Sequence, residues 1–168
     1  MPAFFFMGYV VVEHRITIAC LSKKFFCDYP KDAYPELMDK PERPYACLLL
    51  KADNGYYICI PFRSHIRHNS AYFFKNTIRS KSSKSGLDYT KVVLVKNLEY
   101  LVIGRSIVDQ DEYNEAVKNY HKIARDISSY INDYIEHQKG NCPLHSREFE
   151  RRYRYSTIKY FHNILSLE

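Results

Sequence analysis

The sequence predicts an α+β fold in which a mostly antiparallel sheet comes first and two long helices follow it. Three observations lead to this prediction. Apolar residues alternate with polar ones in short runs up to Ile103, the apolar period becomes helical after Asp109, and only 5 glycines and 7 prolines interrupt the 168 residues. There is no internal repeat and no linker, so we expect residues 1–168 to form a single domain. A chain of this length needs neither a metal nor a disulfide to be stable.

The N-terminal part of the chain is expected to supply the first strands. Residues 4–20 have the pattern of one or two strands, and the apolar run at their start is cut short by Glu13 and Arg15. This run follows no basic segment and is too short to span a membrane, so a buried strand is favoured over a signal peptide. Residues 28–44 contain four prolines and are expected to form an ordered surface loop.

A β-hairpin is the best-defined element of the sequence. Residues 45–50 are typical of a buried strand, Asp53–Gly55 of a turn and residues 56–60 of the returning strand. Pro61 is expected to end that strand. Ser64 would then lie on a loop just beyond a rigid scaffold, where functional groups are common.

The segments between the hairpin and the helices are shorter. Residues 71–79 fit either a strand or a short helix, and residues 80–86 are expected to form a polar, flexible loop. Residues 87–95 and 100–103 are typical of two further strands.

Two helices are expected at the C-terminal end. The first runs from Asp109 to about Gln138, with Asp109 or Asp111 as its N-cap and Gly140 beyond its last turn. The second covers roughly residues 146–165. One face of this second helix carries five basic residues: Arg147, Arg151, Arg152, Arg154 and Lys159.

The charge and the aromatic content favour an anionic partner. The formal net charge is +6, from 25 basic against 19 acidic residues, which bears on partners but not on catalysis. There are 16 tyrosines and 10 phenylalanines, some of which could stack on unpaired bases, although most should belong to the core. The 5 cysteines follow no disulfide or zinc spacing, since the Cys142–His145 pair has no second pair, and this suits a reducing cytoplasm.

Residues 61–68 are the best candidate active site. Arg63, Ser64, His65, Arg67 and His68 provide groups that could cleave RNA without a metal. A histidine can move protons near neutral pH, an arginine can grip two phosphate oxygens, and a serine hydroxyl can donate to a phosphate as charge develops on it. The same residues also fit a solvated polar loop, and the sequence alone leaves that alternative open.

The basic residues of the last helix and of the 80–86 loop are a second candidate site. Arg147, Arg151 and Arg154 recur at helical spacing, so three guanidinium groups could face one nucleic-acid backbone. A solvated helix face, partly balanced by Glu148 and Glu150, is an equally good interpretation.

Four short segments resemble the ToxN/AbiQ toxins of type III toxin–antitoxin systems, nearest the CptN and TenpN branches. They are the run from Arg43 to Ser64, the segments Ala71–Lys75 and Gly86–Val95, and Asp111–Tyr113, and their order and spacing carry a similarity that covers roughly residues 20–165.

This resemblance implies a compact antiparallel, β-barrel-like sheet of the MazF/Kid type with flanking helices. It also implies RNA cleavage by transesterification without a metal or any other cofactor, which leaves a 2′,3′-cyclic phosphate and a 5′-hydroxyl. A small repeated RNA pseudoknot would be both inhibitor and processed product, in a closed protein–RNA assembly that acts in phage defence by abortive infection. No membrane partner is implied.

The resemblance also assigns roles to residues. Ser64 matches the family serine after the second hairpin strand, Arg63 precedes it, and Arg43 is the basic residue that opens the first hairpin strand. The Ser-x-Lys/Tyr region matches residues 21–25. Further RNA contacts are expected from basic residues around the site: Arg67, His68, Lys23, Lys24, Lys75, Lys81, Lys84, Arg147, Arg151 and Arg154.

Two departures from the family pattern shape the expected mechanism. The tyrosine expected near position 25 is Phe25, and the lysine expected two residues after the serine is Ile66. We therefore expect His65, Arg67 or His68 to replace the missing tyrosine and lysine, and we assign His65 as general acid or base. The rival interpretations are a non-catalytic RNA-binding module and a basic protein that binds acidic membrane or protein surfaces.

Overall fold

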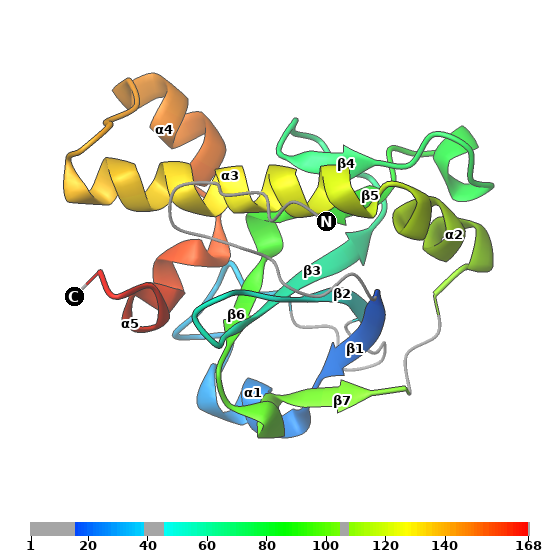
Figure 1. Ribbon diagram of the computed structural model, residues 1–168, viewed down its shortest axis with the longest axis horizontal. Helices are drawn as coiled ribbons and strands as arrows, with labels where there is room; N and C mark the ends of the chain where they lie inside the picture. The colour runs from blue at the N-terminus through cyan, green and yellow to red at the C-terminus, as the bar shows by residue number, and fades with distance from the viewer. Residues whose placement is uncertain (1–15, 39–45, 105–107, 168) are drawn as a thin grey trace.

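The computed structural model describes residues 16–38, 46–104 and 108–167. Within these ranges seven strands form one antiparallel sheet with the order β4-β5-β3-β2-β1-β7, and β6 pairs with β3 beside that path (Figure 1). The strands are β1 (Thr17–Leu21), β2 (Ala46–Lys51), β3 (Tyr57–Arg63), β4 (Ala71–Phe73), β5 (Gly86–Asp88), β6 (Val93–Val95) and β7 (Leu101–Ile103).

Five α-helices and four 3₁₀ turns complete the described structure. The helices are α1 (Lys23–Asp28), α2 (Gln110–Lys118), α3 (Tyr120–Lys139), α4 (Ser146–Tyr153) and α5 (His162–Leu165). The 3₁₀ turns are η1 (Arg79–Lys81), η2 (Tyr89–Lys91), η3 (Leu98–Tyr100) and η4 (Thr157–Phe161). Within the described ranges, no helix has the length and the apolar composition that crossing a membrane requires.

The α+β prediction is confirmed, but the sheet is open. β4 and β7 stand at the two ends of the strand order, and no pairing joins them within the described residues. The structure therefore shows a sheet of antiparallel strands rather than the barrel-like closure that was expected.

β3 is the central strand and carries the candidate loop at its end. It pairs with β6 up to Cys59 and with β5 from Phe62 onward, while β2 runs along its other edge. The expectation that Pro61 ends the strand is wrong, because Pro61 pairs with Cys47 and β3 continues to Arg63. Pro61 lies between the two partners on one edge, where no neighbouring strand requires an N–H.

α3 covers the sheet, and α4 lies beside it (Figure 1). The buried stripe of α3 includes Ile123, Ile127 and Ile131, which have no exposed surface and belong to the same core as Ile58 and Leu94 of the strands. Burying each such side chain contributes about 2 kcal/mol. This packing holds α3 as a fixed wall next to the loop that follows β3.

The first expected helix is interrupted once. Its cap positions are confirmed, because Asp109 is the N-cap of α2 and Gly140 ends α3 with a φ of 73°. At Asn119 the chain leaves helical geometry, and the Asn119 side chain donates to the carbonyl of Glu115. A side chain that competes for a helix carbonyl in this way favours a helix end.

The second expected helix is wrong beyond Tyr153, where α4 ends and η4 and α5 follow as separate short elements. The buried Ser156 sets the break: its hydroxyl oxygen accepts a hydrogen bond from the Ile158 N–H and another from the Tyr130 hydroxyl. The chain thus ends α4 at Tyr153 and forms the hydrogen bond between Ser156 and Tyr130 of α3 in place of further helical turns.

The remaining segments follow the expectations in part. The segment 71–79 begins as β4, the strand expected over 100–103 is β7, and the strand expected over 87–95 is divided by η2 into β5 and β6. Only the end of the first expected strand region is described, as β1, and residues 29–38 form turns of the proline-rich loop. All five cysteines are free, and Cys47 and Cys59 are buried as expected.

Candidate functional site

The loop after β3 presents Ser64 and His65 directly beyond the last strand residue. His65 is exposed and adopts a left-handed backbone conformation, with a φ of 56°, which is uncommon for a residue other than glycine. Ile66 anchors the loop, because its side chain is buried and its N–H donates to the Lys84 carbonyl at 2.9 Å. Strain of this kind persists where the surrounding structure fixes it, and it concentrates at functional sites.

Ser64 and His65 make no side-chain hydrogen bond or ion pair within the described residues. Ser64 is half-buried and His65 is exposed. No hydrogen bond joins Ser64 to a histidine in the described ranges, so no serine–histidine pair forms there. Neither side chain is therefore engaged by the part of the chain that the structure describes.

Arg63 and His68 meet at a carboxylate that the sequence analysis did not identify. Asp88 has no exposed surface, and its Oδ2 accepts from Nη1 of Arg63 at 2.5 Å. Its Oδ1 lies 3.1 Å from Nε2 of His68 and accepts from both the backbone N–H and the hydroxyl of Thr90. Asp88 therefore joins the two ends of the loop 63–68 to the start of η2.

The charge of Asp88 is stabilised by these donors. Burial by itself would raise the pKa of the carboxyl, but the hydrogen bonds from His68, Thr90 and Arg63 outweigh it and hold the pKa below its ordinary value. Asp88 is thus an anion around which the loop is built.

His68 has both ring nitrogens engaged. Its Nδ1 accepts from the N–H of Ser70 at 3.2 Å, so the neutral ring carries its proton on Nε2, which faces Asp88 and the Thr90 hydroxyl. For His68 to act on RNA, one of these hydrogen bonds would have to open. Its geometry suits a positioning role for the loop.

Asp88 has a weak signal in the sequence. It interrupts the apolar run that was interpreted as one strand, and its partners Arg63 and His68 lie 20 or more positions away. An acidic residue inside a strand that faces a core indicates a buried ion pair or a cap. Asp88 serves as both.

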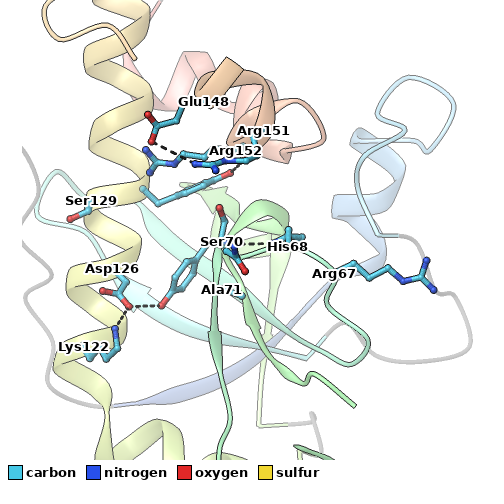
Figure 2. A pocket seen from close by; sticks show the side chains of 13 residues that line it. Arg67, His68, Ser70, Ala71, Lys122, Asp126, Ser129, Glu148, Arg151 and Arg152 are labelled. Atoms are coloured by element: carbon cyan, nitrogen blue, oxygen red, sulfur yellow. Dashed lines mark hydrogen bonds and ion pairs between the residues drawn. The ribbon is translucent and has the colours of Figure 1, made fainter. Parts of the chain in front are cut away.

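A hollow of about 710 Å³ lies between the loop, α3 and α4 (Figure 2). Residues 67–71 form one wall, and Lys122, Asp126 and Ser129 of α3 form the second. The third wall comes from α4 and includes Arg151. Ser64 and His65 do not line this hollow. The two regions that the sequence indicated, the loop and the arginine-rich helix, therefore meet along it.

Other predicted RNA contacts are distributed over the surface. Arg147, Arg151 and Arg154 are all exposed, and the Arg154 guanidinium lies over the ring of Tyr155. Lys81 is exposed as well, and Lys84 reaches over the ring of Phe73.

A second hollow of about 430 Å³ is lined by Lys75 and by residues of α2. The carboxylate of Glu115 occupies its rim, accepting from the backbone N–H groups of Lys75 and Asn76. It is therefore a less cationic surface than the first hollow.

Lys23 and Lys24 belong to α1, which lies next to β7 and away from the end of β3 (Figure 1). Lys24 pairs with Asp28 at 3.1 Å, and Phe25 is fully buried against Tyr29. The structure thus does not bring Lys23 or Lys24 to Ser64. Arg43 lies outside the described residues.

Comparisons of this chain with protein-family models, with curated protein sequences and with solved structures find no match.

Proposed function

We propose that this chain is a metal-independent endoribonuclease toxin of a type III toxin–antitoxin system. One observation carries the proposal: Ser64 and His65 lie side by side at the end of the central strand, with no partner among the described residues and with Arg63 fixed next to them. An unengaged acid–base group next to a hydroxyl and a guanidinium offers a proton-transfer group, a hydrogen-bond donor and a cation, each of which can assist phosphodiester cleavage.

In the proposed reaction the 2′-oxygen of a ribose attacks the adjacent phosphorus, and the bond from phosphorus to the 5′-oxygen breaks. His65 moves one of the two protons in this step, either from the 2′-hydroxyl or to the leaving 5′-oxygen, and water accepts or supplies the other. The Ser64 hydroxyl donates to a phosphate oxygen as its charge grows. The products are a 2′,3′-cyclic phosphate and a 5′-hydroxyl.

Arg63 and Arg67 would hold the phosphate. Arg63 uses one nitrogen for Asp88, and the guanidinium has further N–H groups that remain for a ligand. Arg67 is exposed and makes no ion pair within the described residues. A grip by two arginines, one of them fixed by a buried anion, orients the phosphate before reaction.

The antitoxin belongs to the proposal through the resemblance. A pseudoknot RNA would cover the basic surface around the loop, be processed there, and close a protein–RNA assembly that serves phage defence. The fold would then be a variant of the MazF/Kid type, and the protein would act in the cytoplasm. The order and spacing of the four sequence segments support this part.

The test is cleavage of RNA by the purified chain in excess chelator, beside Ser64→Ala and His65→Ala. We expect cyclic-phosphate products from the unmodified chain and a loss of at least about 100-fold for each variant. His121→Ala, which removes an exposed histidine of α3, is the control and should retain cleavage. Activity that disappears with chelator would contradict the metal-independent mechanism, and undiminished cleavage by both loop variants would remove the loop from the active site.

A non-catalytic RNA-binding module is the second candidate. The observation that favours it is the engagement of His68, which leaves His65 as the one histidine of the loop with unengaged nitrogens. Tight, salt-sensitive RNA binding without cleavage by any sample would select this function.

A further inference from the structure

The hollow beside the loop has the size of a ligand site. Its volume of about 710 Å³ falls within the range of roughly 300–1,000 Å³ that small-molecule sites occupy. Lys122, Arg151 and Arg152 line it together with the carboxylates of Asp126 and Glu148, while the Arg67 side chain extends away from it (Figure 2), so the hollow favours an anion.

Much of its wall is fixed by hydrogen bonds and ion pairs. Asp126 accepts from the Tyr89 hydroxyl and pairs with Lys122 at 2.8 Å. Arg152 pairs with Asp133 at 3.0 Å, and its guanidinium lies over two tyrosine rings. These groups are held before any ligand arrives, which lowers the entropy cost of binding.

Three neutral polar groups of the hollow have no such engagement among the described residues, and Arg151 is only weakly paired. The amide of Asn69 and the hydroxyls of Ser70 and Ser129 have no hydrogen-bond partner within the described ranges. Arg151 is 76% exposed and forms a long ion pair with Glu148, at 4.0 Å. Figure 2 shows Arg151 above the hollow and Ser129 on α3 at its side. The hollow thus offers one cation together with neutral donors and acceptors.

We propose that this hollow takes one unpaired nucleotide. Its phosphate would contact Arg151, and the edge of its base would be read by Asn69, Ser70 and Ser129. An anionic group next to a planar ring with donors and acceptors matches these groups, and unstacked bases are what proteins read in RNA. This inference rests on the proposed function, in which the nucleotide belongs to an RNA strand.

The position of the hollow agrees with this role. Its wall begins at Arg67, two residues after His65, so it adjoins the loop where cleavage is proposed. A strand whose scissile phosphate rests at Ser64 would place a flanking nucleotide in the hollow. The hollow would then decide which RNA sequences are bound.

The experiment measures RNA binding by the full chain carrying Ser64→Ala, so that no substrate is consumed. Arg151→Ala in this background should weaken binding of a single-stranded RNA by about tenfold. Arg147→Ala removes the same charge from the same helix but not from the hollow, and should cause a clearly smaller loss. Equal losses for the two variants would overturn the proposal.

A second variant fills the hollow instead of changing its charge. Ser129→Tyr should weaken RNA binding by about tenfold while its thermal unfolding stays cooperative. Calorimetric titration with adenosine and uridine 5′-monophosphates tests whether the hollow binds a free nucleotide as well as a nucleotide within an RNA strand. A mononucleotide that binds the unmodified chain and not Ser129→Tyr supports the hollow, and one that binds both equally overturns it.

These readouts are independent of cleavage. If the chain cleaves no RNA but shows the Arg151 and Ser129 effects, the proposed enzyme activity is refuted and the nucleotide site is supported. If the chain cleaves RNA and Arg151→Ala binds RNA as well as Arg147→Ala does, the activity is supported and the nucleotide site is refuted.

Discussion

Arg63 and Arg67 lie on the same short loop, yet the structure uses them differently. Arg63 is 30% exposed and is bound to the buried carboxylate of Asp88, whereas Arg67 is exposed and has no ion-pair partner among the described residues. The histidines show the same contrast: both nitrogens of His68 are engaged, whereas no described residue engages the His65 side chain. Charged residues that are adjacent in sequence thus divide into those that build the loop and those that can meet a ligand.

Removing the shared carboxylate should have the largest effect on stability. Asp88→Ala leaves Arg63 and His68 without their anion and leaves the Thr90 N–H unpaired, so we expect a loss of about 4 kcal/mol in the free energy of unfolding. Urea unfolding followed by circular dichroism measures it. Asp126→Ala, at a half-buried carboxylate of α3, serves as the comparison and should lose clearly less. Equal losses would show that Asp88 has no special place in the fold.

The two arginines provide a matched pair. Arg63→Ala should cost about 2 kcal/mol of stability, because Asp88 keeps its donors from His68 and Thr90 but loses one cation. Arg67→Ala should change stability by less than about 0.5 kcal/mol and lower the salt dependence of RNA binding by about one phosphate contact. A reversed pattern would refute the division of roles in the loop.

Lowering the pH should reduce the stabilisation that Asp88 provides through Arg63 and His68. The folded pKa of Asp88 is depressed, so an unfolded chain takes up the proton first as the pH falls. The stabilisation by Asp88 is therefore fully present above about pH 4, the ordinary pKa of an aspartate, and is lost as the pH falls further through the folded pKa. Urea unfolding between pH 2 and pH 6 should show a shallower decline for Asp88→Asn than for the unmodified chain. Parallel curves would show that Asp88 titrates normally.

At His65, which the described residues leave unengaged, a substitution should change stability in the opposite direction and by a small amount. His65→Gly relieves a left-handed backbone conformation, so it should raise stability by up to about 1 kcal/mol while abolishing the proposed cleavage. His65→Asn, a residue that tolerates this conformation, separates loss of the imidazole from relief of strain. A His65→Gly chain that is both destabilised and active would contradict the proposed role of His65.

Much of the fold follows from local patterns. The hairpin of β2 and β3 follows from two apolar runs around Asp53–Gly55, where Gly55 adopts a φ of 87°. The helical period after Asp109 predicted the helix α3, and a buried stripe that includes Ile127, Ile131 and Tyr134 lies along it. The end of α4 was missed, since the hydroxyl of Tyr130 that reaches Ser156 lies 26 positions away and no local signal reveals it.

The site was predictable to a lesser degree. Residue types and spacing led to the loop 63–68 and to Arg151, and the structure places parts of both around one hollow. Neither the role of Asp88 nor the two engaged nitrogens of His68 could be derived, because each depends on contacts between segments that are distant in the chain. Sequence identified the groups with suitable chemistry, and tertiary structure decided which of them remain unengaged.

The turn that carries Asp88 is completed only by residues far along the chain. The Thr157 hydroxyl donates to the carbonyl of Val92 and also lies within hydrogen-bond distance of the Thr90 carbonyl, and the ammonium of Lys91 donates to the Tyr155 carbonyl. During synthesis, a nascent chain that has not reached Thr157 lacks these partners. We therefore expect the turn that carries Asp88 to gain these last hydrogen bonds only after Thr157 has left the ribosome, later than the contacts among residues 63–90 that hold the loop itself.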